Sequence, residues 1–482
     1  MWNLRTAQRA IVVAGCFAMA YTQLTMSPAT IEFARDLGAG GLHFGLLGAL
    51  PTGMLFLQFV AAYVANHLRY RRRLWLGVCL LQRLMLLPVA LGPVLFPDTP
   101  DLVWVWVLIG LTAVNHGMMH FSTPLWLSWM GDYLPRDGLS RYWGVRHLWM
   151  QWTAVASLLL AALFLLGSGL DVRTAFGVLI GLGAVFGVAD ILIFLKVEEP
   201  PIRPLPDPKL SEVFAGPFRH AGFRSFIAYG CFWNFAAMVG APFISLFLLS
   251  HVGMSLFQVL LLWAGSWVGG AALSARLGQN VEEYGNRPVL IAATGFKAIN
   301  MTALLLVPVD PAIAFWVLIP VFMVDAVLNA AIAIASNGFL LKNSPVENRS
   351  MYIAAGTAIA GMVGGLTSIA AGGVLSLLEG RTVSLAGHEW NGFHLLFFVS
   401  LLSRLIAIWF AQRVKEPEGR PTVHVLVQLI GATPLRFMRF PVGLYRSRFG
   451  EEEPSDGITA DDEPDEVQPR EPEPVHTGNG RD

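Results

Sequence analysis

Residues 174–196 read TAFGVLIGLGAVFGVADILIFLK, and this stretch decides the class of fold. Only Asp190 and the terminal Lys196 carry charge within these 23 residues. A helix needs about 20 apolar residues to cross the hydrocarbon core of a bilayer. Because a helix satisfies its own backbone hydrogen bonds, lipid tolerates it. The stretch therefore predicts a membrane-spanning helix.

The composition of the whole chain agrees with this stretch. Apolar residues make up 55% of the 482 residues and charged residues 14%, with a mean hydropathy of +0.56. A typical soluble domain has about 25% charged residues. The composition therefore excludes a water-soluble protein, and it excludes disorder over most of the length, because disorder needs low hydrophobicity.

Eleven further stretches have a similar length and character. We therefore predict an all-α membrane protein with 12 transmembrane helices, of which two (102–129 and 312–339) are longer than a span needs. The predicted helices are 10–31, 43–65, 74–95, 102–129, 148–169, 174–196, 223–250, 255–277, 289–307, 312–339, 352–377 and 392–412.

Lysine and arginine are unequally distributed between the two sets of loops. With the N-terminus in the cytoplasm, the inner segments carry 25 of these residues and the outer segments three, Arg35, Arg173 and Arg381. Basic residues accumulate on the cytoplasmic side of membrane proteins. We therefore expect an integral multi-pass protein of the bacterial cytoplasmic (inner) membrane, with both termini in the cytoplasm.

The longest loop divides the predicted helices into two sets of six. This cytoplasmic linker, residues 197–222, is rich in proline, which makes a semi-rigid spacer. Residues 1–196 and 223–412 are then an N-terminal and a C-terminal six-helix bundle. Residues 413–450 are basic and partly apolar, and they either lie on the inner leaflet in contact with lipid or form a loosely ordered tail. Residues 451–482, with 12 acidic and two basic residues, are expected to be disordered.

Loop motifs and rare polar residues recur in the two halves at nearly constant spacing. Residues 62–71 read AYVANHLRYR and residues 278–287 read GQNVEEYGNR, so Arg71 aligns with Arg287 at an offset of 216. Such spacing predicts duplicated, pseudo-symmetric six-helix units around a central cavity. Within the spans, residues pair as Arg83 with Lys297 and Asp190 with Arg404 at 214, and Asn115 with Asp325 at 210.

The second copy of this loop resembles the signature loop of the major facilitator superfamily (MFS), which is Gly-x-x-x-Asp-(Arg/Lys)-x-Gly-(Arg)-(Arg/Lys). Gly278, Gly285 and Arg287 match it, and Glu282 stands in place of the Asp. The first copy is degraded, because its glycines are missing and Asn66 replaces the acid. The resemblance covers roughly residues 8–415.

The resemblance implies an MFS fold and a secondary transporter from a poorly characterised bacterial branch, which residues 124–135 and 233–243 also resemble. In that family two bundles rock about a midplane site lined by helices one, four, seven and ten. The loop motifs would act as gates, or alternatively as anchors that only fix loop orientation. The gate candidates are Asn66, Arg71, Asp132, Arg141, Glu282, Arg287 and Arg349.

Ionisable groups inside a membrane cost several kcal/mol, so each is a functional candidate. Asp325 lies near the middle of the tenth predicted helix, with Asn329 on the same face at i+4. We interpret Asp325 as a proton or substrate-cation site; the alternative is a static ion pair with Lys297.

Arg83 and Asp190 lie at similar depth by residue count, in helices that this family packs together. We expect them to form a structural buried ion pair rather than to act in transport. Their counterparts Lys297 and Arg404 are both cations, so they must share an anion, meet water or contact lipid headgroups. An anionic substrate stays open on that basis.

His116 and His120 stand at i and i+4, a spacing that suits packing or cavity-lining histidines, a proton relay or a metal. No third ligand is evident, so we expect no metal site. Further candidates for substrate contact, which could equally connect helices, are Gln23, Asn115, Asn234, Trp126 and Trp233.

The sequence therefore predicts a proton- or ion-coupled transporter of a small molecule, not an enzyme, that works as a monomer. Its expected partners are a small-molecule substrate, a coupling proton or cation and membrane lipids; neither a cofactor nor a nucleic acid is expected. Two alternatives stay open. One is a non-transporting or lipid-handling membrane protein on the same scaffold, and the other is a metal-dependent membrane enzyme that uses His116 and His120.

Overall fold

The computed structural model describes most of the chain and is almost entirely helical. The described residues are 3–66, 68–135, 139–201, 219, 221–343, 349–385 and 388–414. Most of the proline-rich linker, nearly all of the predicted inner-leaflet segment and the whole acidic tail lie outside them.

The first half of the chain forms six spans. Their bounds are α1 (Leu4–Thr25) with α2 (Pro28–Asp36); α3 (Gly41–Gly53), η1 (Met54–Phe56) and α4 (Leu57–Asn66); α5 (Arg72–Leu84) with α6 (Leu87–Leu95); α7 (Asp101–Tyr133); α8 (Leu139–Ser168); and α9 (Val172–Ile193) with η2 (Phe194–Lys196).

The second half repeats this arrangement. Its elements are α11 (Ala221–Met238), η3 (Ala241–Phe243) and α12 (Ile244–Ser250); α13 (Leu256–Tyr284); α14 (Asn286–Phe296) with α15 (Ala298–Leu306); α16 (Pro311–Asn343); α17 (Arg349–Leu377); the hairpin β1 (Val383–Leu385) and β2 (His388–Trp390); and α18 (Gly392–Gln412). The two strands are antiparallel, with Val383 opposite Trp390.

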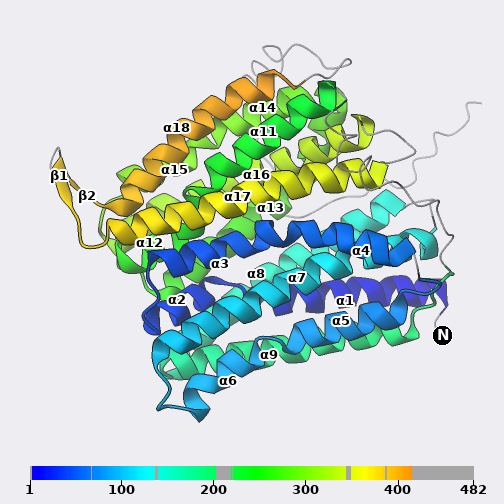
Figure 1. The fold of residues 1–482 in the computed structure, drawn as a ribbon, viewed down its shortest axis with the longest axis horizontal. Helices are drawn as coiled ribbons and strands as arrows, with labels where there is room; N and C mark the ends of the chain where they lie inside the picture. Colours follow the sequence, from blue (N-terminus) through cyan, green and yellow to red (C-terminus); the bar gives the residue numbers. More distant parts are fainter. Residues whose placement is uncertain are drawn as a thin grey trace, which may run out of the picture.

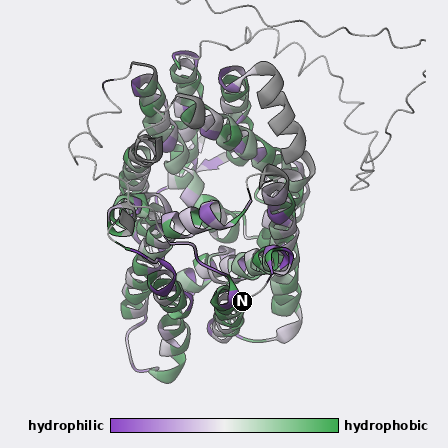
Figure 2. Ribbon diagram, turned by 90° about the vertical axis from the view of Figure 1, so that its right-hand side faces the viewer, coloured by the Kyte–Doolittle hydropathy of each residue, from purple (hydrophilic) through white to green (hydrophobic). Residues whose placement is uncertain are grey.

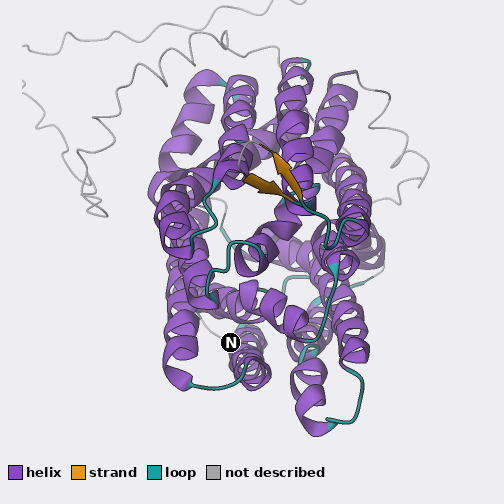
Figure 3. Cartoon of the chain, turned by 90° about the vertical axis from the view of Figure 1, so that its left-hand side faces the viewer, coloured by secondary structure: helices purple, strands orange, loops and turns teal. Residues whose placement is uncertain are grey.

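Figure 1 shows the two halves as bundles that lie side by side, with their helices along the long axis. The chain starts at one end, which we call the N-terminal end, and the β1–β2 hairpin lies at the other, which we call the hairpin end. Figure 3 views the molecule from the hairpin end, where the hairpin and several loops cross the ends of the helices.

The helices meet the length and polarity requirements of a membrane protein. Eleven spans within the described residues are long and apolar enough to cross a bilayer, and α13 contributes a shorter apolar helix over Leu256–Ala271. Large apolar side chains face outward: Leu160 is 67% exposed and Trp316 is 72% exposed. Figure 2 shows that hydrophobic residues predominate around the helices. These surfaces fit lipid rather than water, and the predicted all-α membrane fold is confirmed.

Two spans that the sequence predicts as single helices are broken at corresponding places. Pro28 starts α2, and Ser27 before it is extended (φ −93°, ψ 178°). Pro242 lies in η3, just after α11 ends, and it is 214 residues beyond Pro28. Proline has no N–H to donate and disfavours helical geometry in the preceding residue, so the helix is interrupted. The offset equals that of the repeated charges.

The two bundles meet at α3 and α17, which form the most extensive contact between helices in the described chain. Glycines let their backbones touch: a Cβ atom on Gly45 would lie 2.6 Å from the Ser368 carbonyl oxygen, and one on Gly372 would lie 2.6 Å from the Gly41 oxygen. Small residues permit such close approach of membrane helices. We call the contact of α3 with residues 361–376 of α17 the glycine seam.

The glycine seam predicts a difference between two adjacent glycines of α17. Gly372→Ala should destabilise the observed arrangement by about 1–3 kcal/mol, because the added methyl group overpacks the seam. Gly373→Ala is the control, since a Cβ atom there meets nothing within 4 Å. Thermal unfolding of the two purified variants in the same detergent measures the effect. Equal unfolding temperatures would show that the seam does not depend on backbone contact.

Candidate functional site between the two bundles

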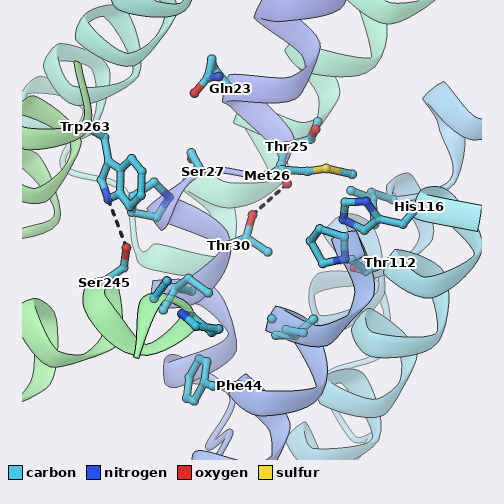
Figure 4. Close-up of a pocket in the computed structure, with 18 of the residues that line it drawn as sticks. Gln23, Thr25, Met26, Ser27, Thr30, Phe44, Thr112, His116, Ser245 and Trp263 are labelled. Carbon is cyan, nitrogen blue, oxygen red and sulfur yellow. Dashed lines mark hydrogen bonds between the residues drawn. The ribbon is translucent and has the colours of Figure 1, made fainter. Parts of the chain in front are cut away.

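A cavity of about 430 Å³ lies between the two bundles and is lined by both (Figure 4). This volume falls in the range of small-molecule sites. Its described lining contains no Asp, Glu, Lys or Arg; the polar groups are amide, hydroxyl, imidazole and indole groups. Those with an amide, hydroxyl or imidazole are Gln23, Thr25, Ser27, Thr30, Thr112, His116 and Ser245.

Both broken spans contribute backbone and side chains to the wall. At the first break, Thr30 Oγ1 donates to the Thr25 carbonyl oxygen at 2.8 Å, as Figure 4 shows. At the second break, Ala241 and Pro242 line the opposite side. In membrane transporters, discontinuous helices characteristically form the binding site at the repeat interface. The breaks therefore place the cavity where the internal repeat predicts a site.

One face of α7 borders the cavity with Thr112 and His116. The next residue on this face, His120, does not line the cavity, because its Nε2 contacts the Pro51 carbonyl oxygen at 2.7 Å. Thr112 Oγ1 and His116 Nδ1 are buried and have no hydrogen-bond partner within the described chain. The two predicted histidines thus lie in different surroundings, and only His116 faces the site.

Aromatic side chains form the wall that the second bundle contributes. Trp263 Nε1 donates to Ser245 Oγ at 3.2 Å, which fixes the indole ring beside the cavity. Trp267, one turn further along α13, and Phe44 of α3 also line the site. The cavity therefore combines hydroxyl groups and an imidazole with flat apolar surfaces.

Of the predicted polar contacts, Gln23 lines the cavity but Asn115 and Asn234 do not. Asn115 Nδ2 donates to the Tyr21 hydroxyl at 2.7 Å and so connects α7 to α1. Asn234 Nδ2 donates to the Gly230 carbonyl oxygen of its own helix at 2.9 Å. Thr112, which the sequence analysis missed, could have been found because it precedes His116 by four residues.

The two predicted tryptophans also lie outside the lining of this cavity. The Trp126 ring packs against Trp143 with 5.5 Å between centroids, and the Arg146 guanidinium lies 4.8 Å from its centre. The Trp233 ring lies 5.8 Å from the Arg404 guanidinium. Both rings therefore accompany buried cations.

The charged residues of the second bundle form a separate cluster. Asp325 contacts the Lys297 ammonium, and Asn329 Nδ2 donates to the same carboxylate at 3.2 Å. Arg404 Nη1 donates to the Lys297 carbonyl oxygen at 2.9 Å. None of these residues lines the cavity, so the structure groups Asp325 with two cations rather than with Gln23 and His116.

Arg83 and Asp190 form the corresponding cluster of the first bundle. Arg83 Nη2 lies 2.9 Å from Asp190 Oδ2, and both side chains are largely buried. The guanidinium also stacks over the Tyr21 ring at 4.3 Å. One acid balances one base here, whereas one acid faces two bases in the second bundle.

Among the gate candidates, Arg71 is held by an acid that the sequence analysis overlooked. Its guanidinium contacts Asp132 and Ser128, and Glu199 Oε1 accepts the backbone N–H groups of Arg71 at 2.5 Å and Arg72 at 3.0 Å. Glu199 therefore caps α5 beside the loop in which Asn66 replaces the usual acid.

Arg287, the counterpart of Arg71, donates through Nη2 to the Gln412 carbonyl oxygen at 2.6 Å. The side chains of the other four gate candidates lie outside the described part of the chain. These are Asn66, Arg141, Glu282 and Arg349.

The chain belongs to the Major Facilitator Superfamily, whose family model matches residues 11–369. No curated protein sequence matches it. The fold is similar to that of a mutant form of the nucleoside transporter NupG, at a TM-score of 0.66, with 13% identity over 86% of this chain and 100% of that one.

Two further solved structures are comparable. One is the xylose transporter XylE from E. coli in an inward open conformation, with a TM-score of 0.62 and 14% identity over 88% of this chain and 99% of that one. The other is a bacterial homologue of the iron transporter ferroportin in an inward-facing state, with a TM-score of 0.62 and 13% identity over 86% and 100% of the two chains. These likenesses show a transporter fold with two bundles.

The buried pair in the first bundle predicts non-additive effects of mutation. Asp190→Leu should destabilise the protein by about 3–5 kcal/mol, because it leaves the Arg83 charge buried without a partner. Arg83→Met together with Asp190→Leu should recover most of that loss. Thermal unfolding of both variants in detergent provides the measurement. A double variant as unstable as the single one would mean that the two charges do not stabilise each other.

Proposed function

We propose that the protein is a secondary active transporter, which carries a small molecule across the cytoplasmic membrane by alternating access. The observation that carries this proposal is the cavity, since both bundles line it and both broken spans meet there. The glycine seam borders the same cavity, because Gly48 of α3 belongs to both. Opening the seam would expose the cavity at the hairpin end, and closing it would leave access from the N-terminal end.

Alternating access predicts that distances at the two ends change in opposite directions. Spin labels at Leu42 and Leu377 report on the hairpin end, and labels at Val60 and Trp409 report on the N-terminal end; all four side chains are exposed. We expect pulsed electron paramagnetic resonance to find two distance populations for each pair. A condition that lengthens one distance should shorten the other. One unchanging distance at each end would contradict the proposal.

We infer that the N-terminal end faces the cytoplasm, because most lysine and arginine residues in the loops gather there. A cysteine at Leu170, between α8 and α9, should then react with a membrane-impermeant maleimide in intact cells. A cysteine at Arg5 should react only after permeabilisation. Both belong in a background that lacks Cys16, Cys79 and Cys231. The reverse pattern would invert the topology.

We also propose that Asp325 couples a proton to the conformational change. Its carboxylate contacts Lys297 and retains 17% side-chain exposure, so protonation would release the ammonium group and alter the cluster. The competing explanation is an ion pair that only stabilises the bundle.

A paired substitution separates these two roles. Asp325→Asn with Lys297→Met removes both charges and so avoids an orphaned cation in the membrane. If Asp325 is the coupling site, the distance populations at the two ends should depend on pH in the wild type but not in this variant. The Arg83→Met and Asp190→Leu variant is the matched control and should keep the dependence. An unchanged pH response in both would leave Asp325 with a structural role.

A further inference from the structure

Two buried polar atoms beside the cavity lack partners. Thr112 and His116 are each 7% exposed, and Thr112 Oγ1 and His116 Nδ1 have no hydrogen bond within the described chain. Other threonines on membrane helices, such as Thr123 of α7, donate to the carbonyl oxygen four residues earlier. Thr112 does not, although its position would permit it. Leaving buried polar groups unpaired is unfavourable, so these two groups indicate a ligand that would bind in the cavity.

The surroundings of His116 indicate which hydrogen bond it offers. A neutral imidazole has one donor and one acceptor nitrogen. Burying an N–H group without an acceptor is rarer than burying a lone pair, so the proton belongs on Nε2 rather than on the enclosed Nδ1. Nε2 has no partner in the described chain and is not enclosed. His116 therefore presents an N–H donor to the cavity, with the Thr112 hydroxyl one turn away.

The absence of charge from the described lining excludes ionic ligands. An ion entering this cavity would lose hydration without meeting a counter-charge. The nearest buried charges are already engaged, Asp190 by Arg83 and Asp325 by Lys297. Trp263 is fixed by its bond to Ser245 and offers a ring surface rather than a free N–H group. The site thus provides hydrogen bonds on one side and flat apolar contact on the other.

We propose that the cavity binds an uncharged organic molecule, in which a carbonyl or hydroxyl oxygen accepts from His116 and Thr112 while a flat apolar part packs against Trp263 and Trp267. This inference rests on the proposed transport function, because it names the substrate class of the same site.

Three probes of equal ring size test the charge preference: benzamide, benzoate and benzylammonium. Full-length protein in detergent is heated with increasing concentrations of each probe. Benzamide should raise the unfolding temperature, because a ligand that binds the folded state stabilises it by mass action. Benzoate and benzylammonium should not. Equal or greater stabilisation by either ion, or no stabilisation by benzamide, would overturn the proposal.

Variants connect the effect to the two orphaned groups. His116→Leu and Thr112→Val should remove the benzamide shift, and they should raise the unfolding temperature of the ligand-free protein by removing unpaired polar atoms. Thr123→Val is the matched control on α7, because its hydroxyl donates to the Met119 oxygen at 2.7 Å. It should keep the benzamide shift and lower the ligand-free unfolding temperature.

The outcomes distinguish this inference from the proposed function. A benzamide shift that survives both cavity variants would refute the assigned contacts, whether or not the two ends move. If the spin-label distances alternate but an ionic probe is preferred, transport stands and the substrate class is wrong. If the distances never change, the transport proposal fails even where benzamide binds.

Discussion

The structure depends on the backbone contact between α3 and α17. Glycines in both helices let two bundles with separate cores touch without intervening side chains, and that contact positions the cavity walls. Such a contact gains mainly from close packing, since lipid supplies no hydrophobic force between helices. Because it contains few polar bonds, such as Ser368 Oγ to the Gly45 oxygen at 2.8 Å, it can separate without leaving many groups unpaired. That property suits a joint between moving bundles.

The internal repeat preserves geometry while it changes chemistry. Pro28 and Pro242 break equivalent spans at an offset of 214, and the breaks meet at one cavity. At the same offset, the acid Asp190 is replaced by the base Arg404, and the second bundle places its acid on α16 instead. The first bundle thus contains a balanced pair, whereas the second contains a carboxylate with two cations. Such asymmetry gives one half a group whose protonation would matter.

The sequence predicted the helical membrane fold, because the free energy of placing about 20 apolar residues in lipid is a local property. It also predicted the repeat and, through the loop motif, the family. Its site predictions succeeded in part: Gln23 and His116 line the cavity, while Asn115, Asn234 and Asp325 lie elsewhere. All five are polar residues within spans, and composition cannot tell which face of a helix meets a cavity and which meets a neighbouring helix.

The sequence by itself determined where the chain crosses the membrane, where proline interrupts a helix and which buried charges need partners, since each follows from residues close together in the chain. Only the tertiary structure decided which partners they have. Glu199 caps α5 from 128 residues away, and Thr112 lost its helical bond only beside a cavity that a second bundle completes. These are long-range contacts, which arise from the packing of whole helices rather than from any local preference.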